Sequence, residues 1–230
     1  MLRLILLFWC SIVFCGVANP LAGEEAKHRR NTQGTNLSLA ENHDPEAERA
    51  SFTLLPGFEV NLFAAEPMLA NPLHMTWDAR GRLWVVCSWA YPQLRPGQTP
   101  NDKVIVLEDE DGDGRADKST VFADGLYIPT GLALSGDSVY VAQTPDIVRF
   151  RDTDGDDVAD EREVVLTGFA IEDSHHSISA WRRGPGGWIY FQEGLFLHSQ
   201  VETQYGTVRM ANGGVFQFQP QTQRLKVFAD

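Results

Sequence analysis

Short runs of apolar and β-branched residues, each ended by Gly, Pro, Asn or Asp, dominate the chain from Phe52 onward. Runs of this length between turn-forming residues are typical of β-strands. The clearest are Arg82–Val86, Lys103–Leu107, Ser138–Ala142 and Gly187–Phe191. No long stretch of the sequence has the 3.6-residue periodicity of an amphipathic helix. The pattern therefore predicts an all-β fold.

A repeated unit in the sequence indicates which all-β fold to expect. Stretches beginning at Pro72, Pro129 and Ser179 each read as strand, polar turn and strand, with an aromatic residue near the middle of the second strand. Each unit then leads to two further β runs. These are Val104–Leu107 and Ser119–Phe122 in the first unit, Ile147–Phe150 and Val164–Leu166 in the second, and Gly214–Phe218 and Leu225–Phe228 in the third. Four short strands in a repeat of about 40 to 50 residues are typical of a β-propeller blade. We expect about three blades, each of four antiparallel strands, over residues 52–230.

A recurring tetrapeptide indicates that this ring is incomplete. Val121–Asp124 leads into the next unit, whereas its copy Val227–Asp230 ends the sequence. Propellers typically have about four to eight blades, so three cannot close a ring. We expect either a chain cut within a propeller or a ring completed by blades from elsewhere. A β-sandwich is a weaker alternative because it leaves the repeats unexplained.

The N-terminal residues have a different character. Arg3 precedes the apolar run Leu4–Cys15, and small residues follow, which is the pattern of a secretory signal peptide over residues 1–18, with cleavage as late as about residue 23. The run is shorter than the roughly 20 residues of a membrane-spanning helix, although an uncleaved anchor is an alternative. Beyond this segment we expect no membrane span. Residues 24–50 are polar and read as a disordered linker. The chain is therefore expected to be exported, to the periplasm or the cell surface.

The net charge of −12 argues against nucleic acid as a partner. Part of the acid lies in two loops that repeat one register, with aspartates at positions one, three, five and nine. Position six, where the loop has to turn sharply, is Gly114 in the first loop, which adopts such a turn freely, and Asp157 in the second, which adopts it at some cost. Position twelve is Glu163 in the second loop. The expected ligands are Asp109, Asp111, Asp113 and Asp117, and Asp152, Asp154, Asp156, Asp160 and Glu163.

Carboxylates that alternate along a tight loop converge, and Ca²⁺ takes about six to eight hard oxygen ligands. Without a cation, carboxylates this close would repel one another. The loops therefore predict structural calcium sites between the outer strands of a blade. Solvated acidic turns are the alternative interpretation.

A pair of histidines precedes the third repeat. His175 and His176 follow Asp173–Ser174 on the connection into a predicted inner strand. Histidines in such a place are often satisfied by neighbouring groups without any chemistry. Inner strands line the central channel of a propeller, however, and a neutral histidine there can accept a proton from a substrate hydroxyl near neutral pH.

From Leu55 onward, about three quarters of the chain, the sequence resembles the beginning of the candidate membrane-bound dehydrogenases of planctomycete-type bacteria, whose propeller is similar to the soluble pyrroloquinoline-quinone sugar dehydrogenases. The matching segments are Ala64–Pro67, Trp77–Val85, Gly184–Tyr190 and Gly213–Phe216. In the quinone enzymes a histidine eight residues before a Gly-Pro-Asp-Gly turn is the general base. The resemblance implies that role for His176, with His175 as the second choice.

The resemblance also implies pyrroloquinoline quinone as cofactor, a sugar or alcohol substrate, and a cytochrome c-type electron acceptor on a C-terminal part that this chain lacks. The sequence departs from the quinone family at Gly184–Gly187, where the turn lacks the aspartate. It contains no Cys-x-x-Cys-His motif and thus no covalent haem. We expect this chain by itself to be inactive, since part of the channel wall would be missing.

Two functions remain open. The first is an exported, calcium-binding propeller oxidoreductase with His176 in the catalytic role. The second is a calcium-stabilised propeller that binds glycans or protein partners without chemistry. Charge, export and calcium loops fit both.

Overall fold

The structure is a computed structural model, and it describes residues 44–230. The expected signal peptide and most of the expected linker lie outside the described residues. The chain divides into two compact units, Met1–Phe63 and Ala64–Asp230. No helix within residues 44–230 is long and apolar enough to cross a membrane.

The described part of the first unit contains one short helix, α1 (Pro45–Ser51). Asp44 caps its first turn, because the side chain accepts a hydrogen bond from the Glu46 N–H at 3.0 Å. Pro45 occupies the first helical position, where its missing N–H costs no helical hydrogen bond. The last residues of the segment expected to be a linker are therefore helical. None of the helical side chains is buried.

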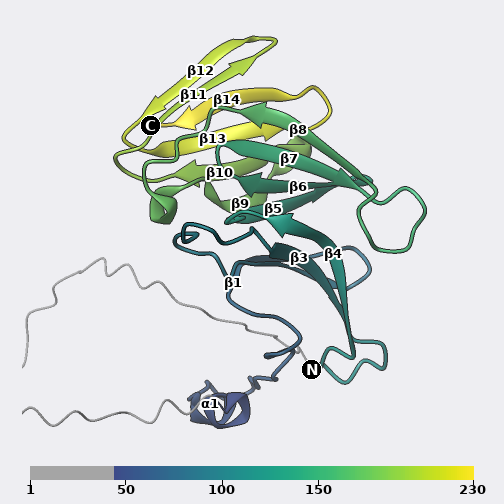
Figure 1. Ribbon diagram of the computed structural model, residues 1–230. Helices are drawn as coiled ribbons and strands as arrows, with labels where there is room; N and C mark the ends of the chain where they lie inside the picture. The colour runs from purple at the N-terminus through teal and green to yellow at the C-terminus, as the bar shows by residue number, and fades with distance from the viewer. Residues whose placement is uncertain (1–43) are drawn as a thin grey trace, which may run out of the picture. The chain divides into compact units, whose positions relative to one another are not determined.

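The second unit consists of antiparallel sheets, and the expectation of propeller blades is confirmed. Three of the sheets have four strands each, and Figure 1 shows that these sheets are stacked face to face. In the first two blades the strands follow one another in sequence order. Blade 1 contains β1 (Pro72–Trp77), β2 (Leu83–Cys87), β3 (Asp102–Glu108) and β4 (Lys118–Leu126), and blade 2 contains β5 (Gly131–Ser135), β6 (Ser138–Gln143), β7 (Asp146–Arg151) and β8 (Glu161–Thr167).

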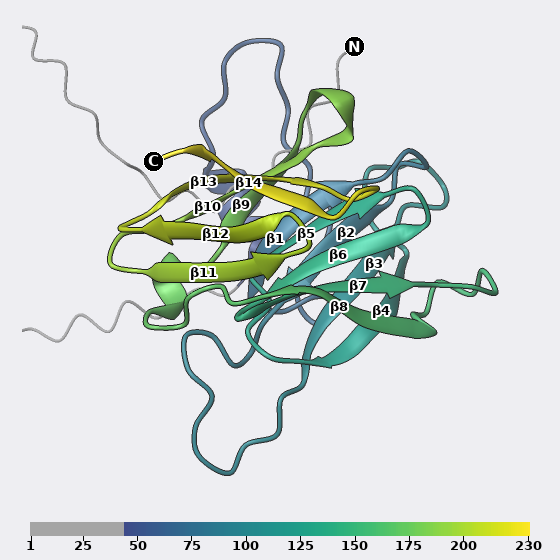
Figure 2. The ribbon, with the colours of Figure 1, turned by 90° about the horizontal axis from the view of Figure 1, so that it is seen from above.

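Blade 3 has an insertion that the repeat pattern did not predict. Its sheet contains β9 (Ser179–Arg183), β10 (Ile189–Glu193), β13 (Gly214–Gln219) and β14 (Arg224–Ala229). A separate hairpin, β11 (His198–Thr203) and β12 (Gly206–Ala211), lies between β10 and β13 in the sequence. Figure 2 shows this hairpin beside the blade sheets. Strand β11 packs against β8 and β12 against β14, so the hairpin bridges the outer strands of blades 2 and 3.

The core lies between the blades, and both faces of blade 2 are buried. Side chains of β6 alternate between the two faces, as the two-residue period of a strand requires. Val139 and Val141 pack toward blade 1 with Phe122, whereas Tyr140 and Ala142 pack toward blade 3 with Phe218. A strand buried on both faces needs apolar residues at every position. This explains why Ser138–Ala142 reads as a nearly continuous apolar run.

The antiparallel topology places the connections at two opposite ends of the blades. The turns β1–β2 and β5–β6 and the loops β3–β4 and β7–β8 lie at one end, here called the aspartate-loop end. The connections β2–β3, β4–β5, β8–β9 and β10–β11 lie at the other end, the histidine end. The three blades form an open arrangement and do not close a ring. The fold is thus an incomplete β-propeller.

Candidate functional site

Both aspartate loops connect outer strands of a blade, as expected, and they share one hydrogen-bond pattern. In the first loop, the two carboxylate oxygens of Asp109 accept the N–H groups of Gly112 (2.7 Å) and Gly114 (2.9 Å). In the second loop, Asp152 accepts those of Gly155 (2.7 Å) and Asp157 (2.9 Å). The repeated register of the sequence therefore corresponds to a repeated backbone conformation.

The remaining loop aspartates each use one oxygen for a nearby backbone N–H. In the first loop, Asp111 accepts the N–H of Asp113, Asp113 that of Arg115, and Asp117 that of Glu110. In the second loop, Asp154 accepts the N–H of Asp156, Asp156 that of Val158, and Asp160 that of Thr153. The second oxygen of each carboxylate can therefore point at a cation. Position six has the left-handed backbone that its sharp turn requires, with φ of 89° at Gly114 and 65° at Asp157.

Three carboxylates come together in each loop, with ligand oxygens within 4.8 Å of one another. They are Asp109, Asp111 and Asp117 in the first loop, and Asp152, Asp154 and Asp156 in the second. Hard oxygen donors at this spacing fit Ca²⁺. The charge of Asp156 raises the pKa of the Asp154 carboxyl, which is the repulsion that a cation would relieve.

The expected ligand Glu163 is placed differently. It lies in β8 opposite Arg149, with which it forms an ion pair, and it is outside the three-carboxylate cluster of its loop. Cross-strand pairing of opposite charges is the ordinary role of such a glutamate. Asp113 and Asp160 also lie outside the clusters, although they take part in the loop hydrogen bonds.

The two predicted histidines lie at the histidine end, in a short 3₁₀ turn, Ser174–His176. Asp173 caps this turn, since one of its oxygens accepts the His175 N–H at 2.8 Å. This hydrogen bond lowers the pKa of the Asp173 carboxyl, and the hydrogen bond with the His175 ring lowers it further. The Ser174 hydroxyl donates to the Pro92 carbonyl oxygen at 2.8 Å, which joins the turn to the β2–β3 connection.

His176 has the geometry of a proton acceptor. Its Nδ1 lies 2.7 Å from the Leu195 carbonyl oxygen, so a neutral ring carries its proton on Nδ1 and has the Nε2 lone pair available. The ring of Phe196 stacks on it at a centroid distance of 5.9 Å. Both contacts come from the β10–β11 connection, which is where the unpredicted hairpin begins.

His175 is more exposed and has different neighbours. Its Nδ1 lies 3.1 Å from Asp173 Oδ1, and 60% of its side chain is exposed. The Tyr91 ring packs edge-on against it at 5.4 Å. Burial, followed by the charge of Asp173, raises the pKa of the Tyr91 hydroxyl.

The sequence analysis did not predict a buried carboxyl at the end of β10, one residue before a backbone contact of His176. Glu193 at the end of β10 is only 3% exposed, accepts a hydrogen bond from the Ser199 hydroxyl, and has one oxygen without a partner. Burial raises its pKa. The next residue, Gly194, donates its N–H to the His176 carbonyl oxygen at 2.8 Å. The only signal in the sequence is a glutamate that ends an apolar strand.

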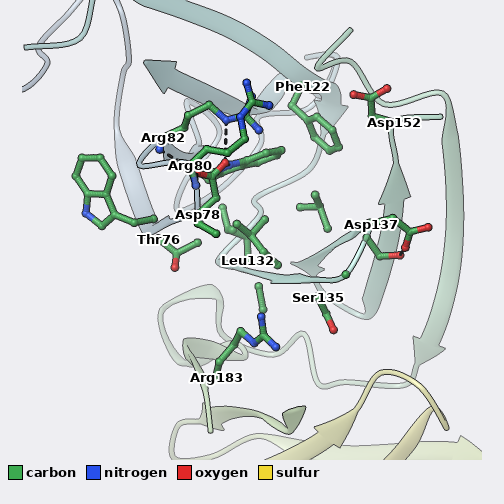
Figure 3. A pocket seen from close by; sticks show the side chains of 18 of the residues that line it. Thr76, Asp78, Arg80, Arg82, Phe122, Leu132, Ser135, Asp137, Asp152 and Arg183 are labelled. Atoms are coloured by element: carbon green, nitrogen blue, oxygen red, sulfur yellow. Dashed lines mark hydrogen bonds and ion pairs between the residues drawn. The ribbon is translucent and has the colours of Figure 1, made fainter. Parts of the chain in front are cut away.

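A cavity of about 830 Å³ lies at the aspartate-loop end, far along the strands from the histidines. Figure 3 shows its labelled residues, among them Asp78, Arg82 and Arg183. All three blades contribute to its wall. Arg82 donates to Asp78 Oδ2 at 2.8 Å and to Asp157 Oδ1 at 2.6 Å, which joins blade 1 to the second aspartate loop. No pattern in the sequence indicates this cavity, because its wall comes from three separate repeats.

The fold and the two ends define the class of this protein as an incomplete β-propeller with paired aspartate loops. Residues 44–230 match the family described as "Domain of unknown function (DUF7133)". The chain belongs to this family. No curated protein matches the chain significantly.

Three solved structures are similar at low identity. Virginiamycin B lyase from Staphylococcus aureus is 13% identical, with a TM-score of 0.39, covering 73% of this chain and 58% of that one. A candidate gluconolactonase is 16% identical, with a TM-score of 0.40 and coverage of 73% and 62%. The quinone-bound aldose sugar dehydrogenase from Streptomyces coelicolor is 16% identical, with a TM-score of 0.33 and coverage of 60% and 42%. The chain spans less than two thirds of the length of each, and the likeness concerns architecture alone.

Proposed function

We propose that the histidine end is the catalytic end of an exported propeller oxidoreductase, and that His176 accepts the proton of a sugar or alcohol hydroxyl. The observation that carries this proposal is the contact between His176 Nδ1 and the Leu195 carbonyl oxygen. It fixes the tautomer in which Nε2 can receive a proton. The ring is also held by Phe196, so its direction is defined before a substrate arrives.

The hydride acceptor is not assigned to the residues of this chain. Pyrroloquinoline quinone carries carboxylates and needs cations around it. Among the described residues of the connections at the histidine end, Arg95 and the adjoining Lys103 are cationic, whereas Asp102, Glu172, Asp173 and Glu193 are acidic. These residues do not by themselves fit that quinone. In this proposal the described residues accept the hydroxyl proton of the substrate. The hydride acceptor and a cytochrome c-type partner would lie outside the described residues.

Calcium and export belong to the same proposal. The aspartate loops would hold Ca²⁺ through Asp109, Asp111 and Asp117 and through Asp152, Asp154 and Asp156. Lying at the opposite end from His176, such ions would act on blade structure and not on the reaction. Residues 1–18 would direct export, which N-terminal sequencing of the protein recovered from the cell exterior or periplasm would test.

The test of the catalytic role uses the protein expressed from its complete open reading frame. Dye-linked oxidation of a panel of sugars and alcohols is measured for the wild type, His176→Gln and His175→Gln. Loss of a general base typically costs about 10²–10⁴ in rate, so His176→Gln should lower kcat strongly with little change in KM. His175→Gln should retain most activity. An active His176→Gln variant would contradict the assignment.

A second candidate function rests on exposed aromatic side chains at the same end. Trp89 is 52% exposed, Tyr127 40% and Phe196 68%. Aromatic faces of this kind suit sugar rings, because they bury apolar C–H surface while the hydroxyls stay in water. A purely binding propeller would bind glycans with equal affinity after His176→Gln, would lose affinity after Phe196→Ala, and would show no oxidation.

A further inference from the structure

The cavity at the aspartate-loop end has polar walls from three blades. Strand β1 and its following turn contribute Thr76 and Arg80, β5 contributes Leu132 and Ser135, and the end of β9 contributes Arg183. Its volume of about 830 Å³ is large enough for a small organic molecule. It lies at the other end of the blades from His176, so it is separate from the proposed catalytic end.

Three arginines of this cavity, Arg80, Arg182 and Arg183, have no ion pair within residues 44–230, and the guanidinium of Arg182 donates to the Trp181 carbonyl oxygen at 2.7 Å. Arg80 and Arg183 are exposed and line the cavity. Arg82 differs, because Asp78 and Asp157 both neutralise it. In Figure 3 the Arg183 side chain extends from blade 3 toward the turn that contains Ser135.

The carboxylates of the cavity wall are already engaged. Asp78 and Asp157 are paired with Arg82. Asp152 belongs to the second aspartate loop, where both its oxygens accept backbone N–H groups and where it is one of the proposed calcium ligands. Asp137 accepts the Ser138 hydroxyl at 2.9 Å and lies 3.9 Å from Arg151 Nη1. The cationic groups of the wall without an ion pair among the described residues are therefore Arg80, Arg182 and Arg183. Arg182 donates to the Trp181 carbonyl oxygen, whereas the side chains of Arg80 and Arg183 make no hydrogen bond within residues 44–230.

The rest of the wall suits an organic anion. Trp84, Phe122 and Leu132 provide apolar surface, and the hydroxyls of Thr76 and Ser135 can donate hydrogen bonds. A guanidinium group presents paired N–H donors that match the two oxygens of a carboxylate or phosphate. An apolar wall beside such donors lowers the local dielectric and strengthens the contact.

We propose that this cavity binds a small organic anion whose carboxylate or phosphate groups pair with Arg80 on the blade 1 side and with Arg183 on the blade 3 side. Arg183 comes from blade 3 and Arg80 from blade 1, so the ligand would span the inner strands. The binding site is independent of the chemistry assigned to His176.

The test follows tryptophan fluorescence of the full chain during titration with inorganic phosphate and, separately, with succinate. Trp77, Trp84 and Trp181 line the cavity and report on its occupancy. We expect saturable binding of at least one of the two anions. Arg183→Gln and Arg80→Gln should each weaken it about tenfold, since a charge-assisted hydrogen bond contributes about that factor. Preference for phosphate or succinate distinguishes the two ligand chemistries.

The matched control is Arg224→Gln. Arg224 is an exposed arginine at the start of β14 that lies over the Tyr205 ring and does not line the cavity. It should leave affinity unchanged, and thermal unfolding should show that all three variants fold. The proposal is overturned if neither anion binds saturably, or if Arg224→Gln weakens binding as much as Arg183→Gln does.

Discussion

Arg82 Nη1 in blade 1 donates to Asp157 Oδ1 in the second aspartate loop at 2.6 Å, across 75 residues of sequence. The same loop donates the Ala159 N–H to the Phe122 carbonyl oxygen of β4 at 2.8 Å. Asp78 Oδ2 accepts hydrogen bonds from Arg82 Nε and from the Trp84 indole N–H. Burial opposes ionisation of Asp78, but these hydrogen bonds together lower its pKa. The loop predicted as a calcium site therefore also fastens blade 2 to blade 1.

Replacing Arg82 should weaken the contact between blades 1 and 2 and lower the free energy of unfolding. Arg82→Met leaves Asp78 and Asp157 as partly buried carboxylates without their cation, which costs about 3 kcal/mol in the free energy of unfolding. Asp157→Asn should cost only about 1 kcal/mol, because asparagine tolerates the left-handed backbone and still accepts a hydrogen bond. Urea denaturation of the three proteins measures both values. Equal losses for the two variants would contradict this account.

His74 should make the fold sensitive to acid. Its Nε2 lies 3.2 Å from the Trp181 carbonyl oxygen and its Nδ1 3.4 Å from the Leu132 N, so it links the inner strands β1, β5 and β9. Burial lowers its pKa from 6.5 to about 4. The unfolded chain therefore binds a proton below pH 6.5 that the folded chain binds only near pH 4.

Stability from His74 is thus fully present above pH 6.5 and is lost as the pH falls from 6.5 to about 4. The difference corresponds to about 3 kcal/mol. His74→Gln keeps a donor and an acceptor but does not titrate, so this part of the pH dependence should disappear. Denaturant unfolding at several pH values measures it. A variant with the same slope as the wild type would rule out His74 as the source.

Calcium should stabilise the fold through both loops. At about 100 times its dissociation constant, a ligand bound only to the folded state adds about 2.7 kcal/mol per site. Asp111→Asn and Asp154→Asn should each remove part of the rise in Tm produced by Ca²⁺, and a chelator should remove all of it. Asp124→Asn, an exposed carboxylate outside both loops, should have no effect. No calcium-dependent shift in the wild type would refute the site.

Gly194 should be intolerant of any side chain because of His176. A Cβ at this position would lie 2.8 Å from His176 Cβ and 2.9 Å from its Cγ. Gly194→Ala must therefore displace the imidazole ring, lowering any activity that needs it and costing about 1–3 kcal/mol of stability.

Gly131→Ala is the matched control for that variant. Its Cβ would lie 2.3 Å from Trp181 Cδ1, so it crowds the core while leaving His176 in place. Both variants should lose stability, but only Gly194→Ala should shift the NMR signals of the His176 ring. Unchanged His176 signals in Gly194→Ala would show that the ring does not depend on this close approach.

Much of the histidine end could not have been predicted from the sequence. The motif around His176 indicated a candidate base, but its orientation depends on Leu195 and Phe196, which belong to the connection into an unpredicted hairpin. The hairpin is visible in retrospect as alternating residues around the Gln204–Tyr205 turn. Glu193 was missed because only packing shows that its carboxyl is buried.

Local patterns determined the strands, the repeat and the aspartate register, since strand period and turn chemistry involve residues close in sequence. The sequence also anticipated the left-handed residue at position six of each loop. Only the tertiary structure decided contacts between blades. The repeated tetrapeptide shows the difference: Phe122 is 2% exposed, because blade 2 packs on it, whereas its counterpart Phe228 is 59% exposed. Identical local sequences reach different burial because stacking of distant segments, and not local propensity, supplies the neighbours.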